Sequence, residues 1–145
     1  MTRIERSAEI VWEGNVARGQ GRISAASGAF GALPYTLATR IGSPEGKTSP
    51  EELLAAAHGG CFTMSLATEL VEAGTPPGRL VVGCRIVMDE VEGQGHQIVG
   101  SIVTVDAEVE GLEEAALREA IAKADEGCPF SALLKRAGAE VQISL

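Results

Sequence analysis

Three short runs of β-branched, aromatic and other apolar residues, separated by glycine-rich breaks, open the chain and predict β-strands. They cover Ser7–Gly14, Gly21–Gly28 and Leu33–Ile41. The segment that follows, GSPEGK, is made of turn residues. The N-terminal part of the chain, about residues 1–48, is therefore predicted to be rich in β-structure.

A long and mostly apolar run comes next, and it carries helix signals at both ends. Ser49 and Glu52 form an S-x-x-E capping box around Pro50, a residue that suits the first helical position. Gly74 and the two prolines after it end the pattern. We expect one continuous helix between Ser49 and Gly74. Because this helix is apolar nearly all round, it needs more cover than one small sheet supplies, and a homodimer would provide it.

In two longer runs, residues 79–91 and 96–111, apolar and polar residues alternate. This pattern predicts strands with one buried face and one face that is more exposed to solvent. An amphipathic helix over residues 112–127, a short helix over 131–138 and a strand over 139–145 complete the chain. The order βββ-α-ββ-αα-β predicts an α+β fold with mostly antiparallel pairing. A chain of 145 residues is long enough for one hydrophobic core, so we expect a single domain over residues 1–145.

Charge and composition limit the kinds of partner that the protein can bind and the cell compartment in which it is expected. A formal net charge of −8 argues against nucleic acid or an anionic membrane as a partner. No apolar run has the length of a transmembrane helix, and the first residues lack the apolar stretch of a signal peptide. We therefore expect a cytoplasmic protein, in which three cysteines would not form a disulfide framework.

The three cysteines differ in their surroundings. Cys84 lies among aliphatic residues of a predicted strand, which favours a buried and inert side chain. Cys61 lies on the long helix directly after Gly59 and Gly60, which leaves small neighbours on the side toward which helical side chains lean. Cys128 lies just before the short helix, where the helix dipole and free N–H groups favour a thiolate. Cys61 and Cys128 are therefore candidates for chemistry, with simple packing as the alternative for each.

His58 lies three residues before Cys61 on roughly the same helical face. A cysteine and a histidine together indicate nucleophilic catalysis, but two side chains side by side on one helix are poorly placed for proton transfer. We therefore favour a structural histidine. A metal site made of Cys61, Cys128, His58 and Glu51 has no supporting ligand spacing, so we expect neither a metal nor another cofactor.

Several motifs resemble the OsmC/Ohr family of thiol-dependent peroxidases. The motifs WEG, TR, PEEL, AAHxxCF and GCPxSxxLK occur in family order and cover nearly the whole chain. VWEG and AAAHGGCFTM resemble the OsmC (osmotically inducible protein C) branch, since the Ohr branch usually carries other residues at positions 58–60. The resemblance implies an intertwined homodimer with active sites at the subunit interface. It also implies reduction of organic hydroperoxides, and of hydrogen peroxide less well.

The resemblance further implies a role for each of four residues. Cys61 would be the peroxidatic cysteine and Cys128 the resolving cysteine. Arg40 would activate the Cys61 thiolate and the peroxide, and Glu51 would orient that arginine. Arg18 is the rival to Arg40, because the Ohr branch takes its arginine from the N-terminal loop. A dithiol, with a lipoyl-type group as one candidate, would reduce the resulting disulfide.

The helix pattern adds a geometric expectation to these roles. Cys61 follows Glu51 by ten positions, so on one helix the two are about 15 Å apart along the axis. Glu51 and Arg40 should therefore reach Cys61 from the other subunit of a dimer. Gly59 and Gly60 would let a partner helix or the alkyl tail of a substrate approach the sulfur, or would only relieve helix packing.

The apolar residues near Cys61 in the sequence suit an apolar tail: Phe62, Met64, Leu66 and Phe130. Two other function classes stay open from the sequence. One is a redox sensor or thiol–disulfide exchange protein that uses the same cysteines. The other is a dimeric module that binds an apolar ligand and has Cys61 only by coincidence.

Overall fold

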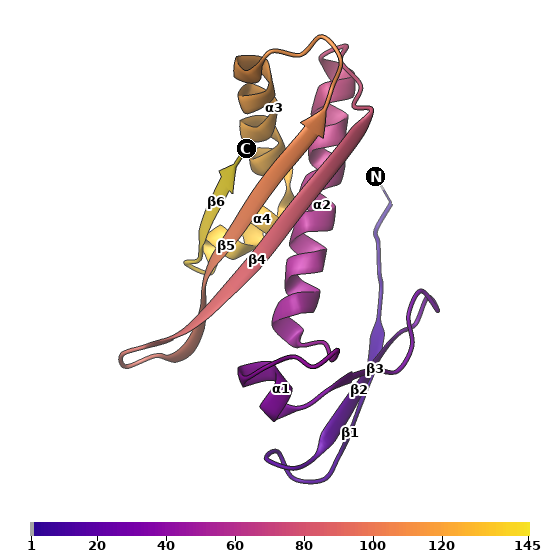
Figure 1. Ribbon diagram of the computed structural model, residues 1–145, viewed down its shortest axis with the longest axis vertical. Helices are drawn as coiled ribbons and strands as arrows, with labels where there is room; N and C mark the ends of the chain where they lie inside the picture. Colours follow the sequence, from indigo (N-terminus) through magenta and orange to yellow (C-terminus); the bar gives the residue numbers. More distant parts are fainter. Residues whose placement is uncertain (1) are drawn as a thin grey trace. The chain divides into compact units, whose positions relative to one another are not determined.

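The computed structural model describes residues 2–145, and the chain divides into two compact units, Met1–Pro50 and Glu51–Leu145. The N-terminal unit is a three-stranded antiparallel sheet in the order β1-β2-β3, with one short helix (Figure 1). The strands are β1 (Ala8–Glu13), β2 (Gln20–Ala25) and β3 (Leu33–Tyr35). The first two strands lie where the sequence predicts them.

The strand predicted over Leu33–Ile41 is wrong beyond Tyr35, because the chain turns into helix α1 (Leu37–Ile41). Thr36 caps this helix in an extended conformation, and its side chain accepts a hydrogen bond from the Thr39 backbone N–H at 3.1 Å. The Thr39 hydroxyl in turn lies 3.3 Å from the Thr36 backbone N–H. This reciprocal capping box ends the strand and starts the helix.

Gly21 is a glycine because two aromatic rings cover it. A Cβ at this position would lie 2.3 Å from the Tyr35 ring and 2.8 Å from the Trp12 ring. Both residues pair with Gly21 across the sheet, and their ring centroids are 5.5 Å apart. The aromatic pair therefore packs over the bare backbone of β2.

The C-terminal unit packs helices against a second sheet (Figure 1). Strands β4 (Arg79–Val91) and β5 (Gly95–Glu108) form a long antiparallel hairpin, and β6 (Glu140–Ser144) joins β5 in parallel. The helices are α2 (Pro50–Glu72), α3 (Glu114–Gly127) and α4 (Pro129–Arg136). The mostly antiparallel α+β organisation predicted from the sequence is confirmed in this unit.

One cluster of buried side chains joins α2, β5 and α3. It contains Phe62, Leu66, Leu70, Val103, Val105, Ala120, Ile121, Ala124 and Cys128. The buried positions of α2 recur every four residues, so one stripe of the helix faces the core. Phe62 and Leu66 are fully buried in that stripe, and the expectation that they serve a substrate tail is therefore wrong.

Helix α2 is continuous, as predicted, and it ends through a glycine. Gly74 has φ +79°, and the N–H groups of Gly74 and Thr75 donate to the carbonyls of Val71 and Leu70 at 3.0 and 2.9 Å. Glycine adopts this conformation without strain, which closes the last turn of the helix.

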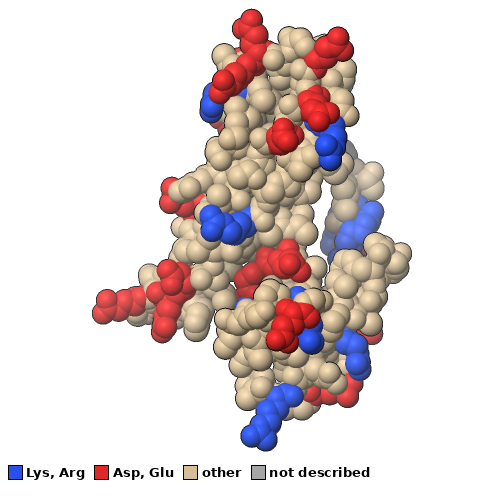
Figure 2. Space-filling view, viewed as in Figure 1, with Lys and Arg blue, Asp and Glu red and all other residues tan. Residues whose placement is uncertain are grey.

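Charged side chains of both signs are spread over the face seen in Figure 2, and acidic ones gather at the tip of the β4–β5 hairpin. Asp89, Glu90 and Glu92 are exposed there. Among the described residues, no helix combines the length and the apolar character that crossing a membrane requires.

Candidate functional site

The fold brings Cys61 and Cys128 together, although they are far apart in the sequence. Cys61 lies in the middle of α2 and is half-buried, whereas Cys128 is fully buried at the corner between α3 and α4. Cys61 packs against the buried cluster that contains Cys128, the two side chains are close enough to influence each other electrostatically, and both cysteines are free thiols. The C-terminal unit therefore contains a pair of reduced thiols in contact.

Cys128 is fixed by the ends of two helices. Its N–H donates to the Asp125 carbonyl at the end of α3, at 3.3 Å. Its carbonyl accepts from the Ala132 N–H in the first turn of α4, at 3.1 Å. Cys128 is thus the C-cap of α3 and the N-cap of α4 at once, which leaves its backbone little freedom.

The environment of Cys61 favours the protonated thiol. Burial is the main cause that raises the pKa of Cys61, and the neighbouring Cys128 side chain raises it further. The Phe130 backbone N–H, from the first turn of α4, acts in the opposite direction and lowers the pKa of Cys61. The raising causes prevail, so the described chain alone does not hold Cys61 as a thiolate.

His58 belongs to a buried hydrogen-bond network next to the two thiols. Its Nδ1 lies 2.6 Å from the Ser101 Oγ of β5, and its Nε2 lies 2.7 Å from the Ser131 Oγ of α4. All three side chains are fully buried. Burial is the main cause that lowers the pKa of His58, with Lys135 acting in the same direction and Asp125 opposing it. His58 is thus a satisfied structural histidine, as favoured from the sequence.

Cys84 is half-buried on β4, next to this network. Its Sγ lies 3.3 Å from the Ser101 Oγ and 3.8 Å from the His58 Nδ1. A Cβ at Gly59 would lie 3.1 Å from the Cys84 Cβ, so Gly59 lets β4 pack closely on α2. Gly60 differs, because it is exposed and a Cβ there would meet no atom within 4 Å.

Of the other predicted site residues, Glu51 belongs to the same unit as the thiol pair, whereas Arg40 and Arg18 belong to the N-terminal unit. Glu51 is in the first turn of α2, about 15 Å along the helix axis from Cys61. Arg40 is in α1 and lines an apolar pocket of about 320 Å³ with Trp12 and Tyr35. Arg18 lies in the turn between β1 and β2, where its N–H donates to the Asn15 side chain at 2.9 Å.

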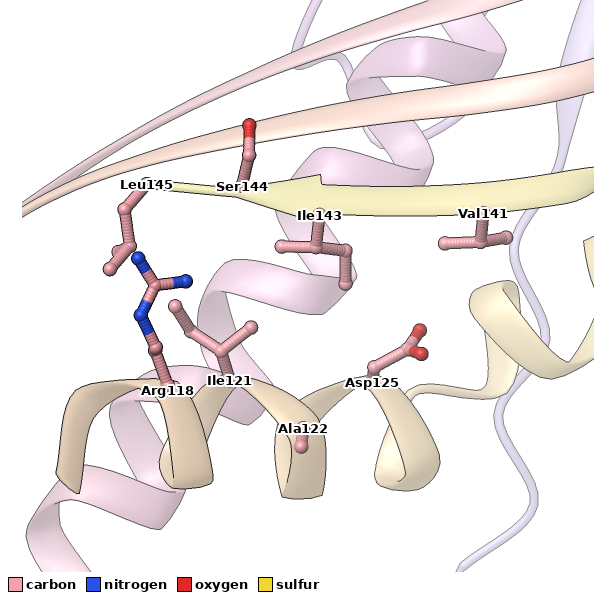
Figure 3. Close-up of a pocket in the computed structure, with 8 residues that line it drawn as sticks. All are labelled: Arg118, Ile121, Ala122, Asp125, Val141, Ile143, Ser144 and Leu145. Carbon is pink, nitrogen blue, oxygen red and sulfur yellow. The ribbon is translucent and has the colours of Figure 1, made fainter. Parts of the chain in front are cut away.

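A different pocket, of about 300 Å³, lies between α3 and β6 (Figure 3). Its walls are Ile121, Ala122, Val141 and Ile143, with Arg118 and Asp125 from α3 at its edges and Ser144, the last residue of β6, and Leu145 at the end of the strand. None of the four predicted site residues lines it. Across residues 2–145, no group of three or more His, Cys, Asp or Glu side chains is arranged to hold a metal.

An α+β fold that holds two free cysteines in contact, one at mid-helix and one at a helix N-terminus, defines a small protein with a paired-thiol site. Residues 42–144 match the sequence model of the family described as OsmC-like protein. Peroxiredoxin OsmC of Escherichia coli (strain K12) is 36% identical over 132 residues, which cover 91% of each chain. The chain therefore belongs to the OsmC-like family.

Solved structures share the fold at low sequence identity. The organic hydroperoxide resistance protein OhrB of Bacillus subtilis has a TM-score of 0.75 at 22% identity, covering 96% of this chain and 97% of that one. The OsmC-like protein from Mycoplasma pneumoniae has a TM-score of 0.77 at 10% identity, covering 99% and 98%. Both matches extend over the N-terminal and the C-terminal unit.

The sequence could not reveal the partners of His58. Ser101 and Ser131 lie 43 and 73 positions away from it, and neither spacing carries a local signal. Ser131 stands inside the GCPxSxxLK motif, which marks the residue but not its contact.

Proposed function

We propose that this chain is a thiol-dependent peroxidase that reduces organic hydroperoxides, and hydrogen peroxide less well. The observation that carries the proposal is the contact between the Cys61 and Cys128 thiols. The similarity to Peroxiredoxin OsmC over 91% of the chain supports it. We also propose a single OsmC-like domain over residues 1–145, and the family match over residues 42–144, which begins near the end of the first unit, supports this.

In the proposed reaction, the Cys61 thiolate attacks one peroxide oxygen, and the O–O bond breaks. The leaving oxygen takes up the proton that Cys61 lost to the solvent, so the products are the Cys61 sulfenic acid and an alcohol, or water when the substrate is hydrogen peroxide. The Cys128 thiol then attacks the sulfenic sulfur, which forms the Cys61–Cys128 disulfide and releases water. A dithiol, for which we propose a lipoyl-type group, restores both thiols and leaves as a disulfide.

The first step requires a cation that the neighbours of Cys61 do not supply, because burial raises the pKa of this thiol. We propose that Arg40 provides the guanidinium and that Glu51 orients it. A guanidinium stabilises the thiolate and the negative charge that develops on the leaving oxygen. Since about 15 Å of helix separates Glu51 from Cys61 in one chain, both activating residues would come from the second subunit.

A homodimer is therefore part of the proposal. The exposed side of α2 carries large apolar side chains, with Met64 74% and Val71 58% exposed. A groove of about 540 Å³ runs between α2 and β4, and exposed Gly60 lies in it. Exposed apolar side chains and a groove on the same helix, the longest described in this chain, fit burial against a second copy.

The direct test is a titration of the reduced protein with cumene hydroperoxide. We expect loss of two thiols per chain, with a Cys61–Cys128 disulfide found by peptide mass spectrometry and reversed by dihydrolipoamide. Cys61→Ser should abolish peroxide consumption, whereas the matched control Cys84→Ser should retain it. Three intact thiols in excess peroxide would overturn the proposal. Oxidation without sustained turnover by any dithiol would instead identify a redox sensor.

A further inference from the structure

His58 connects three elements through two buried hydroxyl groups. Ser101 lies on β5, His58 on α2 and Ser131 on α4, and the two hydrogen bonds measure 2.6 and 2.7 Å. All three residues are 0% exposed. A buried polar network is costly when broken and enforces one geometry when complete. The network therefore specifies where α4 sits against α2 and the second sheet.

The α4 end of this network lies in the same helical turn as the reactive groups. Cys128 is the N-cap of α4, the Phe130 backbone N–H favours the thiolate of Cys61 by lowering its pKa, and Ser131 follows directly. On α2, His58 precedes Cys61 by three positions, close to one turn. The His58–Ser131 bond thus runs beside the Cys61–Cys128 contact, about one turn away on both helices.

Among the described residues, another side-chain interaction links α3 and α4, and it is more accessible to water than the His58–Ser131 hydrogen bond. Lys135 and Asp125 form an ion pair between α4 and α3, with side chains 45% and 19% exposed. Because nearly half of the Lys135 side chain is exposed, solvent screens this ion pair more than it screens the His58–Ser131 bond. The His58–Ser131 bond is shielded from water and links α4 directly to the helix that carries Cys61.

We propose that His58 is a positioning residue, which through Ser131 holds the first turn of α4 so that Cys128 and the Phe130 N–H stay against Cys61. Its consequence for the reaction cycle rests on the proposed peroxidase function. After the first step, the Cys61 sulfenic acid either condenses with Cys128 or reacts with a second hydroperoxide. The second route gives the sulfinic acid and another alcohol, and it inactivates the cysteine.

Four substitutions separate this role from general stability. His58→Leu removes both hydrogen bonds, and His58→Gln keeps one polar group on a side chain of similar reach. Ser131→Ala cuts the network on the α4 side, whereas Ser101→Ala cuts a bond of similar length on the β5 side. If His58→Leu does not fold, Ser131→Ala and His58→Gln still test the proposal, because they change less of the core.

The first readout is the sulfinic acid at Cys61 after exposure to a fixed excess of cumene hydroperoxide, measured by mass spectrometry. We expect about a tenfold rise in the ratio of sulfinic acid to disulfide for His58→Leu and Ser131→Ala, since one lost hydrogen bond is worth about that factor. Ser101→Ala should stay within about twofold of the parent, and His58→Gln should recover part of the loss. The double variant of His58→Leu and Ser131→Ala should be no worse than either single variant.

The second readout needs no peroxide and uses 4,4′-dithiodipyridine in a Cys84→Ser background. The Cys61 thiolate displaces one thiopyridone and forms a mixed disulfide, and the Cys128 thiolate displaces the second and closes the protein disulfide. We expect the second step to slow about tenfold in Ser131→Ala relative to the first step. A general loss of stability would change the rates of both steps alike and would leave their ratio unchanged.

Two outcomes would overturn the proposal. In the first, the rates of the two disulfide-forming steps keep the same ratio in His58→Leu and Ser131→Ala as in the parent protein. The other is an equal effect of Ser101→Ala and Ser131→Ala, which would make the network a general support of the core. Failure of the peroxidase function is recognised separately, because the parent protein would then consume no hydroperoxide while the disulfide probe still reported both steps.

Discussion

Cys61 poses the main problem at the scale of single residues. Its surroundings within the chain raise its pKa, yet a peroxidatic cysteine reacts as the thiolate. Two arginines of the N-terminal unit are the candidates that would offset this. Arg40 lines an apolar pocket with aromatic walls, and Arg18 lies in an exposed turn.

Replacing Arg40 by Met should raise the apparent pKa of Cys61 by one to three units, because a nearby opposite charge shifts a pKa by roughly that much. Alkylation by iodoacetamide at pH 7 should slow in the same proportion. The pH dependence of alkylation gives both quantities. Arg18→Met is the matched control, and a larger effect of Arg18→Met would assign activation to that residue instead.

His58 should make folding sensitive to mild acid. Burial lowers its pKa below the ordinary 6.5, against the opposing charge of Asp125 and together with that of Lys135. Below pH 6.5 the unfolded chain therefore binds a proton that the folded chain does not, and the free energy of unfolding falls as the pH falls. The slope is at most about 1.4 kcal/mol per pH unit for one proton.

Urea unfolding of the parent and of His58→Gln between pH 7.5 and 5 isolates this contribution. Carboxylates contribute equally to both proteins, so the parent should lose more stability than the variant across this range. Parallel pH profiles would show that His58 takes up its proton with similar ease in the folded and the unfolded chain.

At the scale of elements, the two glycines before Cys61 have different neighbours. Gly59 faces Cys84 across a close contact between α2 and β4, and Gly60 faces open space. Each gains about 1 kcal/mol of helix propensity when changed to alanine. At Gly59 alone, the added Cβ would lie 3.1 Å from the Cys84 Cβ, and this crowding would cancel part of the gain in helix propensity.

We therefore expect Gly60→Ala to be more stable than Gly59→Ala by about 1 kcal/mol in urea unfolding, provided that the proposed partner subunit leaves room for one methyl group at Gly60. The reverse order would show that the partner subunit packs directly on Gly60 in the groove between α2 and β4.

The elements themselves were largely predictable, and the exceptions have physical reasons. Helix α2 can be predicted from the sequence because capping residues mark its start and Gly74 marks its end. Helix α1 was missed because its five residues look like the end of a strand, and only the Thr36–Thr39 capping box distinguishes them. The candidate cysteines were found from their motifs, but the serines that fix His58 meet it only through the tertiary fold.

At the scale of the whole molecule, the proposed composite site predicts complementation between inactive subunits. A dimer of Cys61→Ser with Arg40→Met contains one site with a native Cys61 facing a native Arg40. Random mixing of the two variants should restore about a quarter of the parental peroxidase activity, since half of the dimers are mixed and each has one complete site. A site confined to one chain would give no recovery.

The contact between the Cys61 and Cys128 thiols also determines which other thiols can take part. Groups held together within one molecule react as if each were present at an effective molarity far above that of a dissolved competitor. A small monothiol in the surrounding solution would therefore rarely intercept the sulfenic acid before Cys128 does. Dissolved monothiols would therefore not react with the protein during the oxidation steps. Only a reductant that attacks the Cys61–Cys128 disulfide would react with it afterwards.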